Sequence, residues 1–352
     1  MKITKNTYLI IILLLISAGL IWYGVSQTSF QFNFVWRSFL LNTVYFSTIA
    51  LFGTLFYSMH ILANAKWVSK IESVLISMGE VFVFLLVLYL ILFLNLGGNY
   101  SWVENGSDKD WYLSITFFIS RNVFILGGYA LFCFFISKKA LSQVSERKKI
   151  LPAIFLMFFA VTILFYAYDW IVSLDQQWYS TLFGWYLFSG LLVAGLSAAI
   201  LLVLVFEKRL KIDLDKRILK NLARYLFAFS MVWAYLWYVQ YLLPWYTNKP
   251  EEVQYYTSRF ESYSIIFYLG FVLSFVVPFI LLISNFARKN KFVILLASIS
   301  CIIGQWLDKA FYIFPVVDNG VTSLLFVGVG VFVTVSVLFW IVFKYRLKEK
   351  LN

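Results

Sequence analysis

The sequence predicts an all-α integral membrane protein with about ten transmembrane helices and both termini in the cytoplasm. Three observations predict this fold class. First, the 352 residues are 62% hydrophobic and 13% charged, with a mean hydropathy of +0.83, whereas about 25% of the residues in an average soluble protein are charged. Second, apolar runs of about 20 residues, long enough to cross a bilayer, recur along the whole chain. Third, the basic residues gather in alternate loops.

The ten apolar runs are separated by polar segments. The first run follows Lys2 and Lys5, as a signal peptide would, but no small-residue cleavage site follows it, so we expect a retained helix. In the eighth run, we expect Pro278 to cause a kink, because its ring removes one helical hydrogen bond. We place the spans at residues 7–24, 38–63, 74–96, 111–137, 150–171, 181–207, 221–247, 261–285, 291–314 and 321–344.

The loops predict the orientation. Most of the 29 Lys and Arg residues lie on the side that holds both termini, and the opposite side carries Arg37, Lys109, Lys249 and Arg259. Because cytoplasmic loops are enriched in basic residues, this asymmetry places both termini in the cytoplasm. The net charge of +12 is therefore explained by topology and by contact with anionic membrane lipids, and it does not indicate a nucleic-acid partner.

Ionisable residues within or at the ends of the spans are candidate functional residues, because a charge inside the membrane is costly unless it is hydrated or paired. Arg121 lies ten residues after Trp111, or about 15 Å into the fourth span at a rise of about 1.5 Å per residue. The seven candidates form two levels and a midpoint: Glu80 and His60 near the cytoplasm, Asp169, Asp175, Asp308 and Lys309 near the opposite face, and Arg121 between them. This layout is compatible with a proton route through two half-channels or with the binding of a polar head group at the outer level. Buried ion pairs that fix helix packing are the alternative interpretation.

An aromatic segment in the outer half of the seventh span suggests a second kind of site. Gln240 and Tyr241 lie there among aromatic rings, at the same depth as Asp169. Trp178 follows the turn after Asp169 and opens the next apolar run. Aromatic walls with one or two hydrogen-bonding groups suit a quinone ring, so these four residues form a candidate quinone-like pocket. Aromatic residues that face lipid would have the same composition.

The chain shows no redox centre of its own. Cys133 and Cys301 lie inside apolar runs without a neighbouring ligand at metal-binding spacing, and His60 is the only histidine. One histidine cannot hold a bis-histidine haem. We therefore expect no metal or cofactor to be bound by this chain alone.

Several motifs resemble those of a known family. They are Asp-Trp-Ile-Val-Ser-Leu-Asp at 169–175, Trp-Tyr-Ser-Thr-Leu-Phe-Gly at 178–184, Trp245-Tyr246 followed by Pro250-Glu251-Glu252, Arg37 with Leu41-Asn42, and Phe-Phe-Ile-Ser-Arg at 117–121. The sequence resembles the NrfD-like family of membrane subunits, also seen in polysulfide reductase. Within it, the chain is most similar to the ActF-like subunits of bacterial alternative complex III, a quinol:cytochrome c oxidoreductase. The resemblance extends over nearly all ten spans.

The resemblance implies a fold of two four-helix bundles with a flanking helix at each end. The first bundle would cover 38–171 and the second 172–314. The segment 1–37 would form the N-terminal flanking helix and loop, and 315–352 the C-terminal flanking helix with its basic tail. A shift of four spans keeps the orientation, so the two bundles would be parallel repeats.

The resemblance also implies partners and a role in a bacterial inner (cytoplasmic) membrane. The partners would be a second NrfD-like subunit, a periplasmic iron–sulfur subunit, haem c subunits and a terminal oxidase, with menaquinol or ubiquinol as the electron donor. Quinol oxidation would take place in the sister subunit, while this chain takes part in proton movement or carries a second quinone-like site, and would not be catalytic alone. By matching position, Asp169 and Asp175 would belong to the outer half of the route.

Two other functions remain open from the sequence. Paired helix interruptions in the two halves would favour a stand-alone secondary transporter or ion channel. However, Gly127-Gly128 and Pro278 stand at non-equivalent places. A purely structural membrane subunit would use the same buried charges only to fix its packing.

Overall fold

The computed structural model describes residues 5–27, 33–106, 110–140, 149–210, 214–247, 249–314 and 321–351. Within these ranges the chain is helical, without a strand, and ten helical segments are long and apolar enough to cross a membrane. They are α1 (Lys5–Ser26), α2 (Asn33–Leu62), α3 (Glu72–Leu94), α6 (Ile115–Ala140), α7 (Ile150–Trp170), α8 (Phe183–Leu210), α9 (Lys216–Thr247), α10 (Pro250–Phe271) continued by α11 (Val277–Leu282), α12 (Lys291–Ile313) and α13 (Val321–Leu351). The prediction of an all-α membrane protein with ten spans is confirmed.

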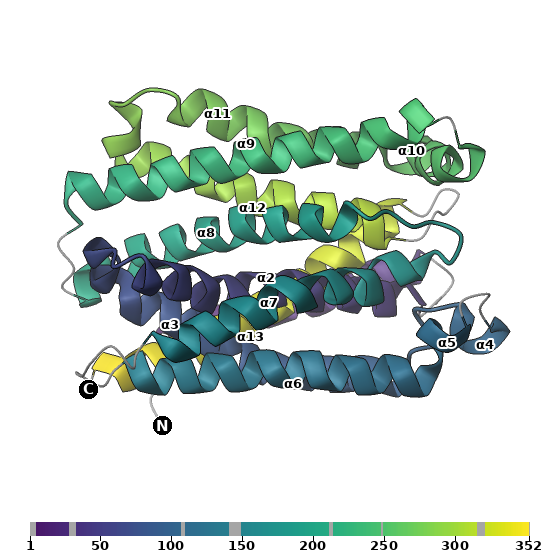
Figure 1. The fold of residues 1–352 in the computed structure, drawn as a ribbon, viewed down its shortest axis with the longest axis horizontal. Coiled ribbons are helices and arrows are strands. Elements are labelled where there is room, and N and C mark those ends of the chain that lie inside the picture. Colours follow the sequence, from purple (N-terminus) through teal and green to yellow (C-terminus); the bar gives the residue numbers. More distant parts are fainter. Residues whose placement is uncertain are drawn as a thin grey trace.

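The long helices run side by side along the longest axis of the molecule (Figure 1). Both chain ends lie at one end of the bundle, which we call the terminal end. The short helices α4 (Trp102–Asn105) and α5 (Asp110–Leu113) lie at the other, which we call the far end. An even number of spans requires the two termini to share a side. The assignment of that side to the cytoplasm stays a prediction.

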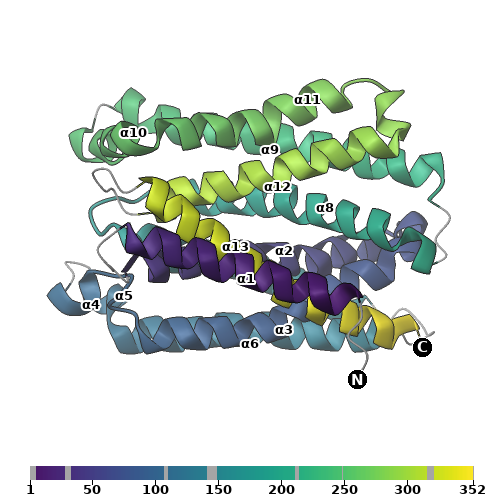
Figure 2. The same ribbon diagram turned by 180° about the vertical axis from the view of Figure 1, so that it is seen from behind.

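Helix α2 lies at the centre of the molecule. It contacts α3, α7, α8, α12 and α13, and 94% of its most apolar window is buried, against 17% for α1, which packs on α13 at the surface (Figure 2). Small polar side chains allow helices in a membrane to approach closely. The buried residues of this kind on α2 are Ser38, Asn42, Thr43, Ser47, Thr48, Thr54 and Ser58.

The helix contacts fall into two sets of four. In the first set α2, α3, α6 and α7 touch one another in turn, and in the second α8, α9, α10–α11 and α12 do so. Contacts of α2 with α8 and of α7 with α8 join the sets, and α13 packs on α2 and α3. These contacts are the ones that a two-bundle arrangement requires, but the division into bundles and flanking segments stays a prediction.

Most spans begin or end a few residues from their predicted limits, and three of these differences change the interpretation. The fourth does not start at 111, because Ser114 separates α5 from α6. The eighth begins earlier, at Pro250, where a proline is well suited to the first helical turn. The tenth continues to Leu351, through the segment predicted to be a basic tail. A π-helical turn, Val272–Val276, interrupts the helix just before Pro278, the residue at which a kink was predicted.

The contact between α8 and α2 depends on a glycine. A Cβ atom at Gly195 would lie 2.1 Å from the Cβ atom of Phe52, whereas a Cβ atom at Gly127 on α6 would meet nothing within 4 Å. We expect Gly195→Ala to destabilise the protein by about 1–3 kcal/mol, as overpacking does. Gly127→Ala, the matched control, should be neutral or slightly stabilising. Thermal unfolding in detergent measures both, and equal midpoints for the two variants would contradict the close approach.

Candidate functional site

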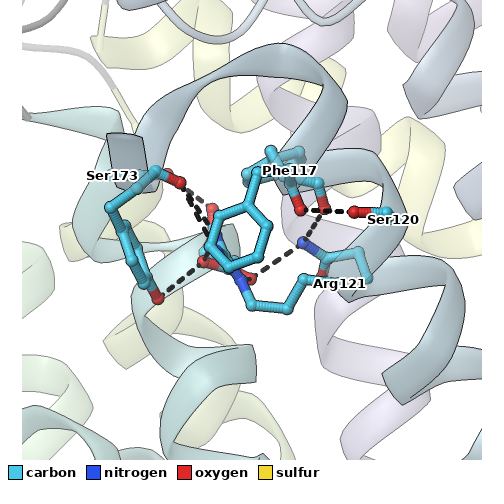
Figure 3. Close-up of polar contacts among 8 residues, drawn as sticks. Phe117, Ser120, Arg121 and Ser173 are labelled. Carbon is cyan, nitrogen blue, oxygen red and sulfur yellow. Dashed lines mark hydrogen bonds and ion pairs between the residues drawn. The ribbon is translucent and has the colours of Figure 1, made fainter. Parts of the chain in front are cut away.

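A buried ion pair lies at the far end of the first helix set (Figure 3). Arg121 of α6 donates from Nε to Asp169 Oδ2 at 2.8 Å and from Nη2 to Oδ1 at 2.7 Å, which is a bidentate contact. Asn122 Nδ2 donates to Oδ2 at 2.8 Å, and the Tyr112 hydroxyl donates to Oδ1 at 3.0 Å. We call these four residues the far-end cluster. Asp169, at 0% exposure, thus accepts four hydrogen bonds, which stabilise its ionised form.

The break at Ser114 gives this cluster its shape. It turns α5 so that the backbone carbonyl of Tyr112 accepts from both terminal nitrogens of Arg121, at 3.3 and 3.4 Å. The guanidinium also lies over the Tyr112 ring at 3.9 Å and over the Phe117 ring at 4.6 Å. Burial raises the pKa of the Tyr112 hydroxyl, and the Asp169 carboxylate raises it further, so Tyr112 stays a hydrogen-bond donor.

The sequence predicted that Arg121 lies between two levels of charge, and the structure shows that it does not. The helix that carries it begins at Ile115, so Arg121 lies six residues from the helix start, or about 9 Å along the axis. Asp169 is in the last turn of α7, next to the turn Val172–Leu174. Both charges belong to the far end, where they neutralise each other.

A second buried ion pair lies at the terminal end of the same helix set. Lys350, near the end of α13, donates from Nζ to Glu80 Oε1 at 3.1 Å and to Ser137 Oγ at 2.6 Å. Ser137 also donates to Glu80 Oε1, while Glu80 Oε2 is buried without a hydrogen-bond partner among the described residues. We call Glu80, Ser137 and Lys350 the terminal-end cluster. The sequence predicted Glu80 at this end, but it missed Lys350, because that residue was assigned to a tail outside the membrane.

Buried hydroxyl and thiol groups lie between the two clusters. On the terminal-end side, Thr54 donates to Cys133 Sγ at 3.2 Å. Farther along, Thr162 Oγ1 donates to the Tyr129 hydroxyl at 2.9 Å. The hydroxyls of Tyr89 and Tyr166 are hydrogen-bonded to each other, and the rings of Tyr129 and Tyr166 have centroids 6.5 Å apart.

These groups form a polar stripe on one face of α6. Asn122, Tyr129, Cys133 and Ser137 are all buried, and the last three are spaced four residues apart. Residues with this spacing share a helix face and lie about 6 Å apart along the axis. The stripe thus lies between the far-end cluster and the terminal-end cluster. Its spacing was readable in the sequence, although the hydroxyl partners on α3 and α7 were not.

His60 lies at the terminal end of α2, but no hydrogen bond joins it to Glu80 within the described ranges. Its Nδ1 lies 2.8 Å from the Phe56 carbonyl oxygen, which can only accept, so Nδ1 carries the proton. Its Nε2 lies 3.1 Å from the Tyr225 hydroxyl of α9, and the Trp67 ring packs against it. The buried histidine therefore joins the two helix sets.

Asp308 and Lys309 form a separate group in the second helix set. The Tyr186 hydroxyl of α8 donates to Asp308 Oδ1, and Lys309 Nζ lies 5.6 Å from the centroid of the Tyr45 ring. No hydrogen bond or ion pair links either residue to the far-end cluster in the part of the chain that the structure describes. The structure therefore does not place Lys309 on one path with Glu80, Arg121 and Asp169.

The four residues of the predicted quinone-like pocket do not form one pocket. Asp169 is enclosed in the far-end cluster. Gln240 is used on both sides, because its Oε1 accepts from Ser180 Oγ at 2.8 Å and its Nε2 donates to the Tyr256 hydroxyl at 3.2 Å. The remaining two are packed against other rings: Trp178 stacks on Tyr255, and Tyr241 packs against Trp237, Trp245, Tyr256, Phe260 and Phe267. These residues do not fit a quinone as a group, and we derive no step through one.

Asp175 lies apart from Asp169, across the turn that follows α7. Its Oδ2 is 4.0 Å from Nη1 of Arg259 on α10.

No group of three or more His, Cys, Asp or Glu residues in the described ranges is arranged to hold a metal ion. No protein-family model matches this chain, and no curated protein is significantly similar to it.

The far-end cluster predicts strong coupling between its two charges. Removing one partner of a buried ion pair leaves the other charge uncompensated, which costs about 3–5 kcal/mol. We expect Arg121→Gln alone to lower the free energy of unfolding by about that amount, and Arg121→Gln with Asp169→Asn to lower it much less. Unfolding of the single and double variants in detergent gives the coupling free energy. Additive effects of the two substitutions would show that the pair is not a unit.

Proposed function

We propose that this chain is a proton-conducting membrane subunit of a quinol-oxidising respiratory complex. The observation that carries the proposal is the polar stripe of α6, which lies between two buried ion pairs at opposite ends of the first helix set. The stripe supplies hydroxyl and thiol groups, and the clusters at its ends supply the carboxyl groups of Glu80 and Asp169. Such groups can pass a proton by exchanging hydrogen bonds. The role in a respiratory complex comes from the resemblance to the ActF-like subunits.

In the proposed route the terminal-end cluster exchanges protons with one side of the membrane. Glu80 Oε2 is the buried atom without a partner and is the natural proton acceptor there. The proton then passes by Ser137, Cys133 and Tyr129 to the Tyr166–Tyr89 pair. The steps along α6 are about 6 Å long, so each requires a water molecule or a side-chain rotation to bridge it.

The far-end cluster would act as the exit. Four donors contact Asp169, two of them from Arg121, so in this proposal the carboxylate receives a proton only when Arg121 moves away. That requirement makes the pair a gate, because the Asp169 carboxylate and the Arg121 guanidinium must separate before a proton passes. In this proposal Asp308 and Lys309 lie outside the route, and electrons travel through haem c and iron–sulfur groups of partner subunits.

The alternative of a stand-alone transporter has less support. Transporters of this kind use interrupted helices in corresponding positions of two repeats. The third helix of the second set is interrupted at Val272–Val276, but α6, the third helix of the first set, runs without interruption from Ile115 to Ala140. The purely structural alternative predicts that neutralising Glu80 or Asp169 changes assembly without changing turnover.

Isolation from native membranes tests the complex. We expect a mild-detergent pull-down of this chain to bring down c-type haem, visible in the optical spectrum, and iron–sulfur polypeptides, identified by mass spectrometry. A second purification in a milder detergent controls for loss of partners. A colourless chain without partners in both preparations would defeat the assignment to a redox complex.

Substitution of the stripe tests the proton route. We expect Tyr129→Phe to lower proton translocation per electron by about tenfold or more, because it removes a transfer group while keeping the ring. Asp169→Asn should lower either turnover or the proton yield in the assembled complex. Tyr235→Phe, at a side chain 66% exposed on α9, is the matched control. Proteoliposomes that contain the complex, supplied with quinol and cytochrome c, report both quantities, and an unchanged yield in Tyr129→Phe would remove the stripe from the mechanism.

A further inference from the structure

A polar pocket of about 270 Å³ opens at the far end, between the start of α2, the loop after α7, α10 and the end of α12. Its polar lining comes from Arg37, Asp175, Ser258 and Arg259, and Leu174 and Phe314 add apolar walls. The volume is below the range of about 300–1,000 Å³ that is typical of sites for drug-sized ligands. The pocket therefore suits a small polar group.

Arg259 is held rigidly at this pocket. Its guanidinium lies over the Tyr255 ring at 3.6 Å, and that ring stacks on Trp178 at 4.0 Å with an interplanar angle of 10°. One contact with its own helix, from Nη1 to the Tyr255 carbonyl at 3.4 Å, fixes the head group further. Although the residue is 6% exposed, its Nε has no hydrogen-bond partner among the described residues. A buried donor without a partner is costly, so it points to a ligand.

The charges in the pocket do not balance. Arg37 lines it from α2, facing the same space as Arg259, and Asp175 is the one carboxylate among the described residues of the lining. Asp175 Oδ2 does not form a hydrogen bond with Arg259, because the separation of 4.0 Å from Nη1 is too long for one. Its Oδ1 accepts a hydrogen bond from the backbone N–H of Gln177 at 3.2 Å. Two guanidiniums against one carboxylate leave a net positive charge. Like charges held together at a partly buried site are unfavourable unless an anion joins them.

We propose that this pocket binds a phosphate-type oxyanion, supplied either by a phospholipid head group or as free phosphate. Guanidinium groups match phosphate oxygens with paired, charge-assisted hydrogen bonds. The pocket lies at the end of the spanning helices, the depth at which lipid head groups lie in a bilayer. This site is separate from the proton route, and it assigns Asp175 to tuning the pocket charge.

Calorimetric titration of the intact chain tests the site, with its co-purified partners, after delipidation into a maltoside detergent that carries no phosphate group. The two probes are inorganic phosphate and a water-soluble short-chain phosphatidylglycerol. Binding of the phosphatidylglycerol alone identifies a lipid site, whereas binding of both identifies a site for free phosphate as well. If neither probe binds, the proposal fails.

Variants separate this pocket from general surface charge. We expect Arg259→Gln and Arg37→Gln each to weaken binding by about tenfold or more, since each loses a charge-assisted contact. Lys249→Gln, at an exposed cation beside the start of α10, should change affinity by less than about twofold. Asp175→Asn should tighten binding, because it removes the competing carboxylate and keeps both arginines. Equal affinities for Arg259→Gln and the unaltered chain, or weaker binding by Asp175→Asn, would overturn the proposal.

Discussion

The bidentate contact between Arg121 and Asp169 is the constraint on which the far end of the first helix set depends. A guanidinium and a carboxylate can be buried together only if nearly all their donors and acceptors are satisfied. Here that requires three separate features: α5 must turn back at Ser114 to offer the Tyr112 carbonyl, α6 must present Asn122 beside Arg121, and α7 must place Asp169 in its last turn. The breaks and ends of these helices therefore follow from one ion pair.

The terminal end of the set is tied in a different way. Lys350 comes from α13, which lies outside the first four helices, and its ammonium reaches Glu80 and Ser137 because α13 stays helical to Leu351. Each end of the polar stripe is therefore closed by one buried cation, but the far-end cation belongs to the same helix set and the terminal-end cation does not. A movement of α13 would uncover Glu80 without disturbing the packing of α3 on α6.

The sequence predicted the ten spans well because hydropathy over about 20 residues reports directly on the thickness of the bilayer. It predicted most of the buried charged residues, although not Lys350 or Arg259. It did not predict how they pair, since pairing depends on how each helix is rotated and where it begins. Counting from Trp111 placed Arg121 too deep because Ser114 was not recognised as a break. Gln240 and Asp169 share a depth in sequence, yet they belong to different helix sets, because depth alone does not fix a position around the bundle axis.

The two arginine sites at the far end show how the same residue type serves two purposes. Arg121 has a carboxylate of its own, two hydrogen bonds to one backbone carbonyl and two aromatic rings, so four of its five N–H groups already have a partner. Arg259 is also clamped by a ring, but its carboxylate stands 4.0 Å away and its Nε has no partner among the described residues. A guanidinium whose donors are mostly used fixes structure, whereas a rigid guanidinium with unused donors, next to a second one, is preorganised to bind an anion.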